Sequence, residues 1–241
     1  MRADGTLAGP ASGGEASRSY LSTTAGRQLT GENGLAGNLG DDGIGQLTFV
    51  NGPDQLRYVL DFGAPTAIAG PINLTLWASS TAPDTDFFVD LLDVAPGGEV
   101  SYLQRGLQRA SHRAIDDDKS DFVPSGTEAG AYYRAHHPHT NTTLQTLTPL
   151  VPEKFEIEIF PVGHLFRAGH KLVIQIHAPP PQDPLSIYVW VSGQPPAINT
   201  VFHDAEHRSS LLLPVMPVLP PLGTAPACGE MIGVPCFTPL L

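Results

Sequence analysis

The stretch Pro161-Val-Gly-His-Leu-Phe-Arg-Ala-Gly-His-Lys-Leu-Val-Ile-Gln-Ile176 decides the fold class of this 241-residue chain. Its pattern predicts a turn at Pro161, a corner punctuated by Gly163 and Gly169, and then a strand. In that strand, Leu172–Ile176, apolar residues alternate with others, which is typical of a β-strand with one buried face. We expect the two glycines to adopt positive φ or to pack closely against neighbouring chain.

Similar short apolar runs recur along the chain and predict about eight strands. A Gly-Pro pair at 70–71 predicts a turn before one of them. The 25 glycines and 24 prolines suit many short strands better than long helices, and no stretch keeps a helical period over three turns. We therefore predict an all-β jelly-roll sandwich, of galactose-binding-domain-like type. Besides 172–176, the predicted strands are 47–50, 56–60, 72–78, 87–94, 100–104, 155–160, 187–191 and 210–214.

Composition divides the chain into three parts. Residues 1–45 are rich in Gly, Ser, Ala and Thr and predict a linker or an extended wrap. Residues 46–220 carry the strand pattern and form the predicted sandwich, and 221–241 form a tail. Inside the sandwich, the polar connection 116–152 is long for a loop, so we expect it to be functional or packed against something else.

The charge balance excludes some partners. A formal net charge of −11, with only 13 Lys and Arg, argues against nucleic acid. No run of 18 apolar residues predicts a membrane span. The first ten residues lack an apolar signal core, so either a signal was removed or the chain is part of a longer product. We expect an extracellular or cell-envelope location.

The two cysteines, Cys228 and Cys236, flank a short segment containing Gly and Pro. Such a segment can close into a disulfide in an oxidising compartment, and we predict that bond. The alternative is a pair of free thiols in a flexible tail.

Three groups of residues are candidates for a binding site. His137 and His139 in the run 136–139 form an H-x-H pair like that of metal-binding cupins, but the next acid is Glu153 and two imidazoles do not fill a metal shell. Asp116–Asp118 could supply oxygens to calcium, although a solvated acidic loop is the ordinary reading. We predict no metal and no cofactor.

Trp77 and Trp190 form the third group and could stack on a sugar if both were exposed. Each alternates with core-facing residues, so each could instead pack beneath another domain.

Several blocks, in order, resemble the C-terminal non-catalytic jelly-roll domain of the cocaine esterase and X-Pro dipeptidyl-peptidase (CocE/NonD) serine hydrolases. Any one block would be weak, but five or more in the right order make chance similarity improbable. The blocks are Ile68–Ile72, Ala78–Val94, Leu103–Arg113, His137–Thr140, the segment beginning at Pro161, Asn199–His203 and Ser210–Pro214.

The residues in these blocks have structural explanations first. Asp84 and Asp86 can accept backbone N–H bonds in an Asx-type turn before a strand. Arg109 and Arg113 stand at a strand exit, where we expect the guanidinium to clamp carbonyls or Asp93. Turn and cap residues of this kind rarely do chemistry.

The departure from the family enzymes is equally informative. They carry an α/β-hydrolase domain with a nucleophile-elbow serine, whereas no G-x-S-x-G occurs here. We therefore assign no catalytic residue and predict that the chain alone is inactive. His164, His170 and His203 lie in jelly-roll blocks and are not expected to act as triad histidines.

The resemblance implies an accessory domain that packs on and stabilises an α/β-hydrolase domain absent from this chain. An apolar face normally covered by that partner would then be open to self-association. The alternative is a stand-alone jelly-roll module for carbohydrate or another small ligand, since fold alone does not fix function. A cupin-like metalloenzyme is a third hypothesis, weakened by the missing third ligand.

Overall fold

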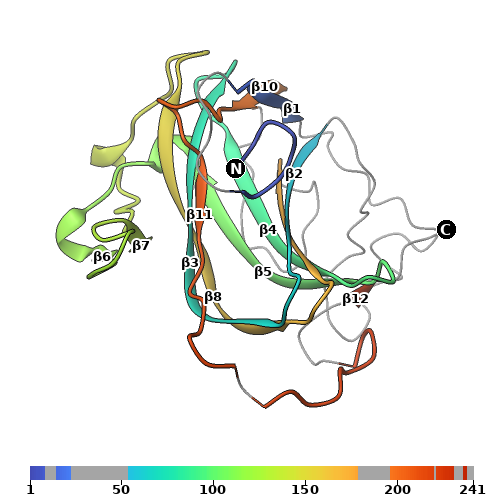
Figure 1. The fold of residues 1–241 in the computed structure, drawn as a ribbon. Helices are drawn as coiled ribbons and strands as arrows, with labels where there is room; N and C mark the ends of the chain where they lie inside the picture. The colour runs from blue at the N-terminus through green and yellow to red at the C-terminus, as the bar shows by residue number, and fades with distance from the viewer. Residues whose placement is uncertain (9–14, 23–53, 179–195, 220, 231–235, 238–241) are drawn as a thin grey trace.

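The computed structural model describes residues 1–8, 15–22, 54–178, 196–219, 221–230 and 236–237 (Figure 1). Within these residues the chain forms twelve β-strands and three one-turn 3₁₀ helices. The strands are β1 Arg18–Ser22, β2 Gln55–Asp61, β3 Thr66–Ser80, β4 Asp86–Val94, β5 Val100–Arg109, β6 Asp121–Phe122, β7 Tyr132–Arg134, β8 Glu153–Phe166, β9 Lys171–His177, β10 Ala197–Val201, β11 Ser210–Leu212 and β12 Cys236–Phe237. The helices are η1 Ala110–His112, η2 Asp117–Lys119 and η3 Asn141–Thr143.

Eight strands follow one another in the order β1-β10-β3-β8-β5-β4-β9-β2, and their named pairings are antiparallel. The sheet folds back on itself between β8 and β5, so that its two halves form two layers. Strands β8 and β5 share a single register pair, Gly106 with Ile159. A Cβ at Gly106 would stand 2.7 Å from the Glu158 carbonyl oxygen, so only glycine allows this crossing. This arrangement confirms the predicted all-β sandwich.

The core lies between the two layers and consists of inward-facing residues of the long strands. Phe87 and Phe155 meet there with ring centroids 4.9 Å apart. Leu74, Leu76 and Ile157 are fully buried beside them. The alternation that predicted strands at 72–78, 155–160 and 172–176 is therefore the alternation between core and outer face.

The N-terminal residues belong to the sandwich. Strand β1 pairs with β10 at one end of the sheet. Residues Gly5–Leu7 lie along β2 at the other end, with the Leu7 amide donating to the Val59 carbonyl and the Val59 amide donating to Gly5. One segment thus covers both edges, and the sheet begins well before the predicted boundary at residue 46. Residues 9–14 and 23–45, which make up the larger part of the predicted linker, lie outside the described residues.

The turns predicted at Gly70-Pro71 and at Pro161 are wrong. Both positions lie inside long strands, β3 and β8, where the register slips between Gly70/Val162 and Ile72/Ile159. Proline has no N–H for a ladder and is tolerated at such a bulge, so the chain bends there without ending its strand. Figure 1 shows β3 and β8 bending together. The turn after β8 lies instead at residues 167–170.

The two glycines of the deciding stretch differ. Gly169 has φ +83°, as expected for the corner before β9. Gly163 lies within β8 without positive φ, and a Cβ built on it would meet nothing within 4 Å, so the expectation for Gly163 is wrong. The strands predicted at 47–50 and 187–191 lie outside the described residues.

The connection 116–152 carries the small β6–β7 hairpin and the helices η2 and η3 beside the main sheet (Figure 1). The tail 221–241 also returns to the fold, because β12 pairs with β5. In the described part of the chain, no helix is long and apolar enough to cross a membrane.

Candidate functional site

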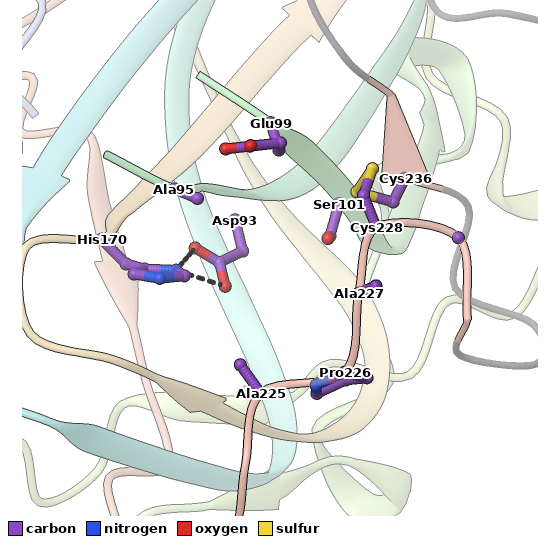
Figure 2. A pocket seen from close by; sticks show the side chains of 11 residues that line it. Asp93, Ala95, Glu99, Ser101, His170, Ala225, Pro226, Ala227, Cys228 and Cys236 are labelled. Atoms are coloured by element: carbon purple, nitrogen blue, oxygen red, sulfur yellow. Dashed lines mark hydrogen bonds and ion pairs between the residues drawn. A yellow bond between two sulfur atoms is a disulfide. The ribbon is translucent and has the colours of Figure 1, made fainter. Parts of the chain in front are cut away.

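A cavity of about 380 Å³ opens at one end of the sandwich (Figure 2). The polar side chains of Asp93, Glu99, Ser101 and His170 line one side. Small residues of the C-terminal segment 225–229, with the cysteine pair, line the other. Convergent polar groups facing an apolar wall are what small-molecule sites have in common.

Sheet register explains why these side chains meet. Asp93, near the end of β4, lies directly opposite Ser101 of β5 on one side and Leu172 of β9 on the other. Residues opposite one another in antiparallel strands point to the same face, and Leu172 is a fully buried core residue. Cys236 of β12 lies opposite Ser101 in turn. The pocket is therefore the outer end of the core itself.

Asp93 binds two imidazoles. His164 Nε2 lies 2.8 Å from Oδ2, and His170 Nδ1 lies 2.9 Å from Oδ1 and 3.1 Å from Oδ2. The carboxylate is nearly buried, with 7% of its side chain exposed. Of the two contacts expected for Arg109 and Arg113, carbonyls or Asp93, the contact with Asp93 is not the one formed: His164 of β8 and His170 of the turn before β9 bind this carboxylate instead.

The pocket residues do not form a hydrolytic triad. A triad needs an imidazole between the serine and the carboxylate. His170 contacts Asp93, but no hydrogen bond joins it to Ser101, and Figure 2 shows the two dashed contacts only between His170 and Asp93. Among the described residues, no three His, Cys, Asp or Glu side chains are grouped so that they could hold a metal ion.

The predicted disulfide pair forms part of this wall. Cys228 and Cys236 are bonded to each other in the structure, with Cα atoms 5.2 Å apart. The bond ties the end of the 225–229 segment to β12, and through β12 to β5. The cysteines thus hold the lid-like segment against the pocket.

The H-x-H pair has a structural use. His137 Nδ1 lies 3.0 Å from the Ala114 carbonyl oxygen and its Nε2 lies 2.8 Å from that of Glu156. Both ring nitrogens thus face backbone oxygens, and the ring links the segment after η1 to β8. His139 adopts φ +51° and packs against His137 and His112, a neighbour that the sequence did not reveal. Burial, aided by the neighbouring histidines, lowers the pKa of His139.

Two of the three aspartates at 116–118 have protein partners. Asp116 accepts from Lys119 at 2.7 Å, and that hydrogen bond lowers the pKa of the carboxyl. Asp117 accepts from the Tyr132 hydroxyl at 2.6 Å, which raises the pKa of Tyr132 to about 12. These contacts fix η2 against the β6–β7 hairpin, so the aspartates serve the local fold.

Both predicted Asx-type residues hold the end of β4 and β5, but in different ways. Asp84 Oδ1 accepts from the Thr85 and Ser111 amides at 3.0 and 2.8 Å, as expected. Asp86 instead pairs with Arg109. Arg113 donates to the carbonyls of Ala110 and Gln145, the expected carbonyl clamp.

Trp77 is half-buried, with the His207 ring against its edge at 4.9 Å, and is not an open stacking platform. Trp190 lies outside the described residues. His203 is buried under Tyr58, whose hydroxyl lies 2.7 Å from its Nε2, while its Nδ1 lies 3.0 Å from the Ala16 carbonyl oxygen. This histidine joins the N-terminal segment to the core.

Sequence reasoning missed a buried ionic group within the sheet. Asp90 is fully buried between Arg105 Nε at 2.7 Å and His177 Nε2 at 2.8 Å. Burial alone would raise the pKa of Asp90, but the two basic partners outweigh it and hold that pKa well below its usual range. The only signal in sequence was a pair of charged residues, Asp90 and Asp93, inside the otherwise apolar strand Phe87–Val94.

Comparisons with known proteins point in one direction. Residues 6–212 match the family model described as the X-Pro dipeptidyl-peptidase C-terminal non-catalytic domain. The chain is 26% identical over 222 residues to the cocaine esterase of Rhodococcus sp., covering 88% of this chain and 34% of that protein. It is 30% identical over 155 residues to a Mycobacterium bovis protein that carries the name of a serine esterase, covering 63% of this chain and 22% of that protein.

Solved structures share the fold. An α-amino acid ester hydrolase superposes with a TM-score of 0.66 at 21% identity, covering 90% of this chain and 35% of that chain. A CocE/NonD family hydrolase from Staphylococcus aureus gives 0.63 at 19% identity, covering 90% and 36%. The chain thus spans about a fifth to a third of the length of its matched relatives.

Proposed function

Because the chain belongs to the family of X-Pro dipeptidyl-peptidase C-terminal non-catalytic domains, we propose that it is the accessory module of a serine hydrolase that cleaves esters or peptides. In this role it packs on an α/β-hydrolase domain and stabilises it, while the other domain carries out the chemistry. The observation that carries the proposal is the family match over residues 6–212 in a chain without a nucleophile elbow.

The surface offers a docking face of the right character. We define the docking face as the exposed apolar residues of the segment 215–222 together with Phe160 of β8. Phe160 stands on the bulge of β8, and the segment 214–216 lies along β3 on its other side, with the Met216 amide donating to the Ala67 carbonyl. Large apolar patches on a monomer usually mark interfaces. The residues of the docking face are Phe160, Val215, Met216, Val218, Leu219 and Leu222.

The side chains of the docking face are exposed to solvent over a large fraction of their surface. Val218 is 73% exposed, Val215 56% and Phe160 55%. A lone exposed apolar side chain needs no explanation, but five within the short segment 215–222 do. A covering domain would remove them from water.

An activity assay tests the non-catalytic role. The isolated chain should turn over neither a p-nitrophenyl ester nor an X-Pro chromogenic dipeptide. Saturable turnover that a serine-reactive phosphonate abolishes would contradict the proposal. Inclusion of the Rhodococcus cocaine esterase as a positive control makes a negative result of the ester assay meaningful.

Sedimentation velocity and hydrophobic-dye binding test the docking face. The isolated chain should self-associate or bind the dye, and Val215→Asp with Val218→Asp should reduce both. Val151→Asp is the matched control, because Val151 is 45% exposed but lies in the 116–152 connection. A monomeric, dye-silent wild type would contradict the docking face without touching the activity result.

An extracellular or cell-envelope location is part of the proposal, and the bonded cysteine pair supports it, because disulfides persist in oxidising compartments. The stand-alone binding module remains the second candidate function. The pocket at the end of the sandwich is the observation in its favour.

A further inference from the structure

We propose that the pocket between β4, β5 and the C-terminal segment 225–229 binds a small organic cation, a primary amine with an apolar body. Its ammonium group would lie against Glu99, Ser101 and Asp93. This inference does not depend on the accessory role, because it concerns a site on this chain alone.

The polar groups of the pocket have unused acceptor capacity. Within the described residues, neither the Glu99 carboxylate nor the Ser101 hydroxyl has a hydrogen-bond or ion-pair partner. Asp93 accepts from His164 and His170, and a carboxylate offers about four lone-pair sites, so these contacts do not exhaust it. An ammonium group brings three donors, which matches three acceptors on one wall.

The residues that line the cavity indicate that its ligand carries a positive charge. Two carboxylates face the cavity, and the described residues that line it include neither lysine nor arginine. An anion would meet repulsion from Asp93 and Glu99. The formal net charge of −11 adds a long-range attraction for cations over the whole molecule.

The size of the cavity and its apolar wall favour an organic ligand over a bare metal ion. The described residues contain no group of three His, Cys, Asp or Glu side chains that could hold a metal. A cavity of about 380 Å³ is in the range of small-ligand pockets. Ala225, Pro226 and Ala227 present apolar surface opposite the carboxylates.

The position of Asp93 in the fold strengthens its attraction for an ammonium group. Asp93 shares its face with the buried Leu172, so the pocket floor adjoins the apolar core. Charges attract more strongly where water is partly excluded. The Cys228–Cys236 bond holds the opposite wall in place, so the site is largely formed before a ligand arrives.

Calorimetric titration of the full chain with benzylamine tests the proposal, with benzyl alcohol as the neutral probe of the same shape. We expect saturable benzylamine binding in the millimolar range and about tenfold weaker binding of benzyl alcohol. Amide chemical shifts of Ala227 and Gly229 should move with benzylamine. Equal affinity for the two probes, or no saturable binding of benzylamine, would overturn the proposal.

Variants locate the site. Glu99→Gln should weaken benzylamine binding about tenfold, and Ser101→Ala should weaken it about threefold. Glu206→Gln is the matched control, since it removes the same charge at an exposed position outside the pocket lining. An equal loss of benzylamine affinity in Glu206→Gln would show that the overall charge of the protein causes the effect, and would overturn the proposal. Thermal unfolding of each variant confirms that it is folded before its affinity is compared.

Discussion

Arg109 grips Asp86 by both carboxylate oxygens, with Nε donating to Oδ1 at 2.8 Å and Nη2 to Oδ2 at 3.0 Å. The two residues lie opposite each other in the β4–β5 register, and the Asp86 side chain is fully buried. Such a bidentate contact is stronger and more specific in geometry than a single hydrogen bond. It fixes the end of the strand pair beside the cap made by Asp84.

Arg109→Ala should lower the free energy of unfolding by about 3 kcal/mol, because it removes the guanidinium that makes two hydrogen bonds to a buried carboxylate. Urea unfolding followed by tryptophan fluorescence measures the change. Arg134→Ala serves as the control, since Arg134 pairs with Asp121 at the surface and should cost under about 1 kcal/mol. Equal losses in the two variants would contradict the assignment.

Gly70→Ala should destabilise the fold by about 1–3 kcal/mol, because Gly70 has φ +135° and a Cβ would stand 3.3 Å from the Pro214 Cβ. Gly163, in β8 beside the same bend, has ordinary φ and open space around its Cβ position. Gly163→Ala should therefore be neutral or slightly stabilising. A shift of the same size in both thermal unfolding curves would show that the bend does not depend on Gly70.

Deletion of residues 1–22 should cause aggregation, because it uncovers the edges of both β2 and β10. Deletion of residues 1–8 uncovers only the β2 edge and should cause less. Sedimentation velocity and thioflavin T fluorescence report the two outcomes. A monomeric 1–22 deletion would mean that the edges are protected by other residues.

Stability should fall as the pH drops below about 6.5, in part through His203. Burial lowers the pKa of His203 in the folded state. The unfolded chain therefore binds the proton first, and the stability that the neutral ring contributes above its ordinary pKa is lost as the pH falls through the folded pKa. His139, whose pKa is also lowered, contributes in the same direction.

Urea midpoints measured across this pH range, for the wild type and for His203→Gln, check the contribution. The variant should be less stable at neutral pH, because Tyr58 loses its partner, and should show a shallower pH dependence. An unchanged dependence of the urea midpoint on pH in the variant would mean that other titrating groups cause the loss of stability.

Cys228 and Cys236 should be bonded to each other in natively exported protein. Intact mass before and after reduction with alkylation measures it, and two thiols should become available only after reduction. Two alkylatable thiols without reductant would contradict both the bond and the export that we propose.

The sequence predicted the strands that have a clear apolar pattern and missed a strand that lacks one. Period-2 alternation located β9 and about half of β3 and of β8, because burial of one face dictates it. The same reasoning ended strands at Pro71 and Pro161, since a proline at a bulge and a proline at a turn look alike without the partner strand. Strand β1 was missed because Arg18–Ser22 shows little apolar pattern and is held by pairing with β10.

The pocket was less accessible to sequence reasoning than the fold. Asp93 was one of two contacts expected for Arg109 and Arg113, but register places Asp93 beside Ser101 and Asp86 opposite Arg109. The histidines 164 and 170 are 71 and 77 positions from Asp93, a separation that no local pattern encodes. Only the bond between the cysteines, eight positions apart, followed from local spacing.

The closure of the sheet by its first strand also sets the order in which the protein can be made. Ser19 and Thr200 face each other although 181 positions separate them. At ribosomal speed the N-terminal strand emerges roughly 10 to 40 s before its partner is synthesised. During that interval both the strand and the nascent sheet have open edges. Strand β1 can therefore take its place in the sheet only after β10 has been synthesised, so this edge of the sandwich forms late.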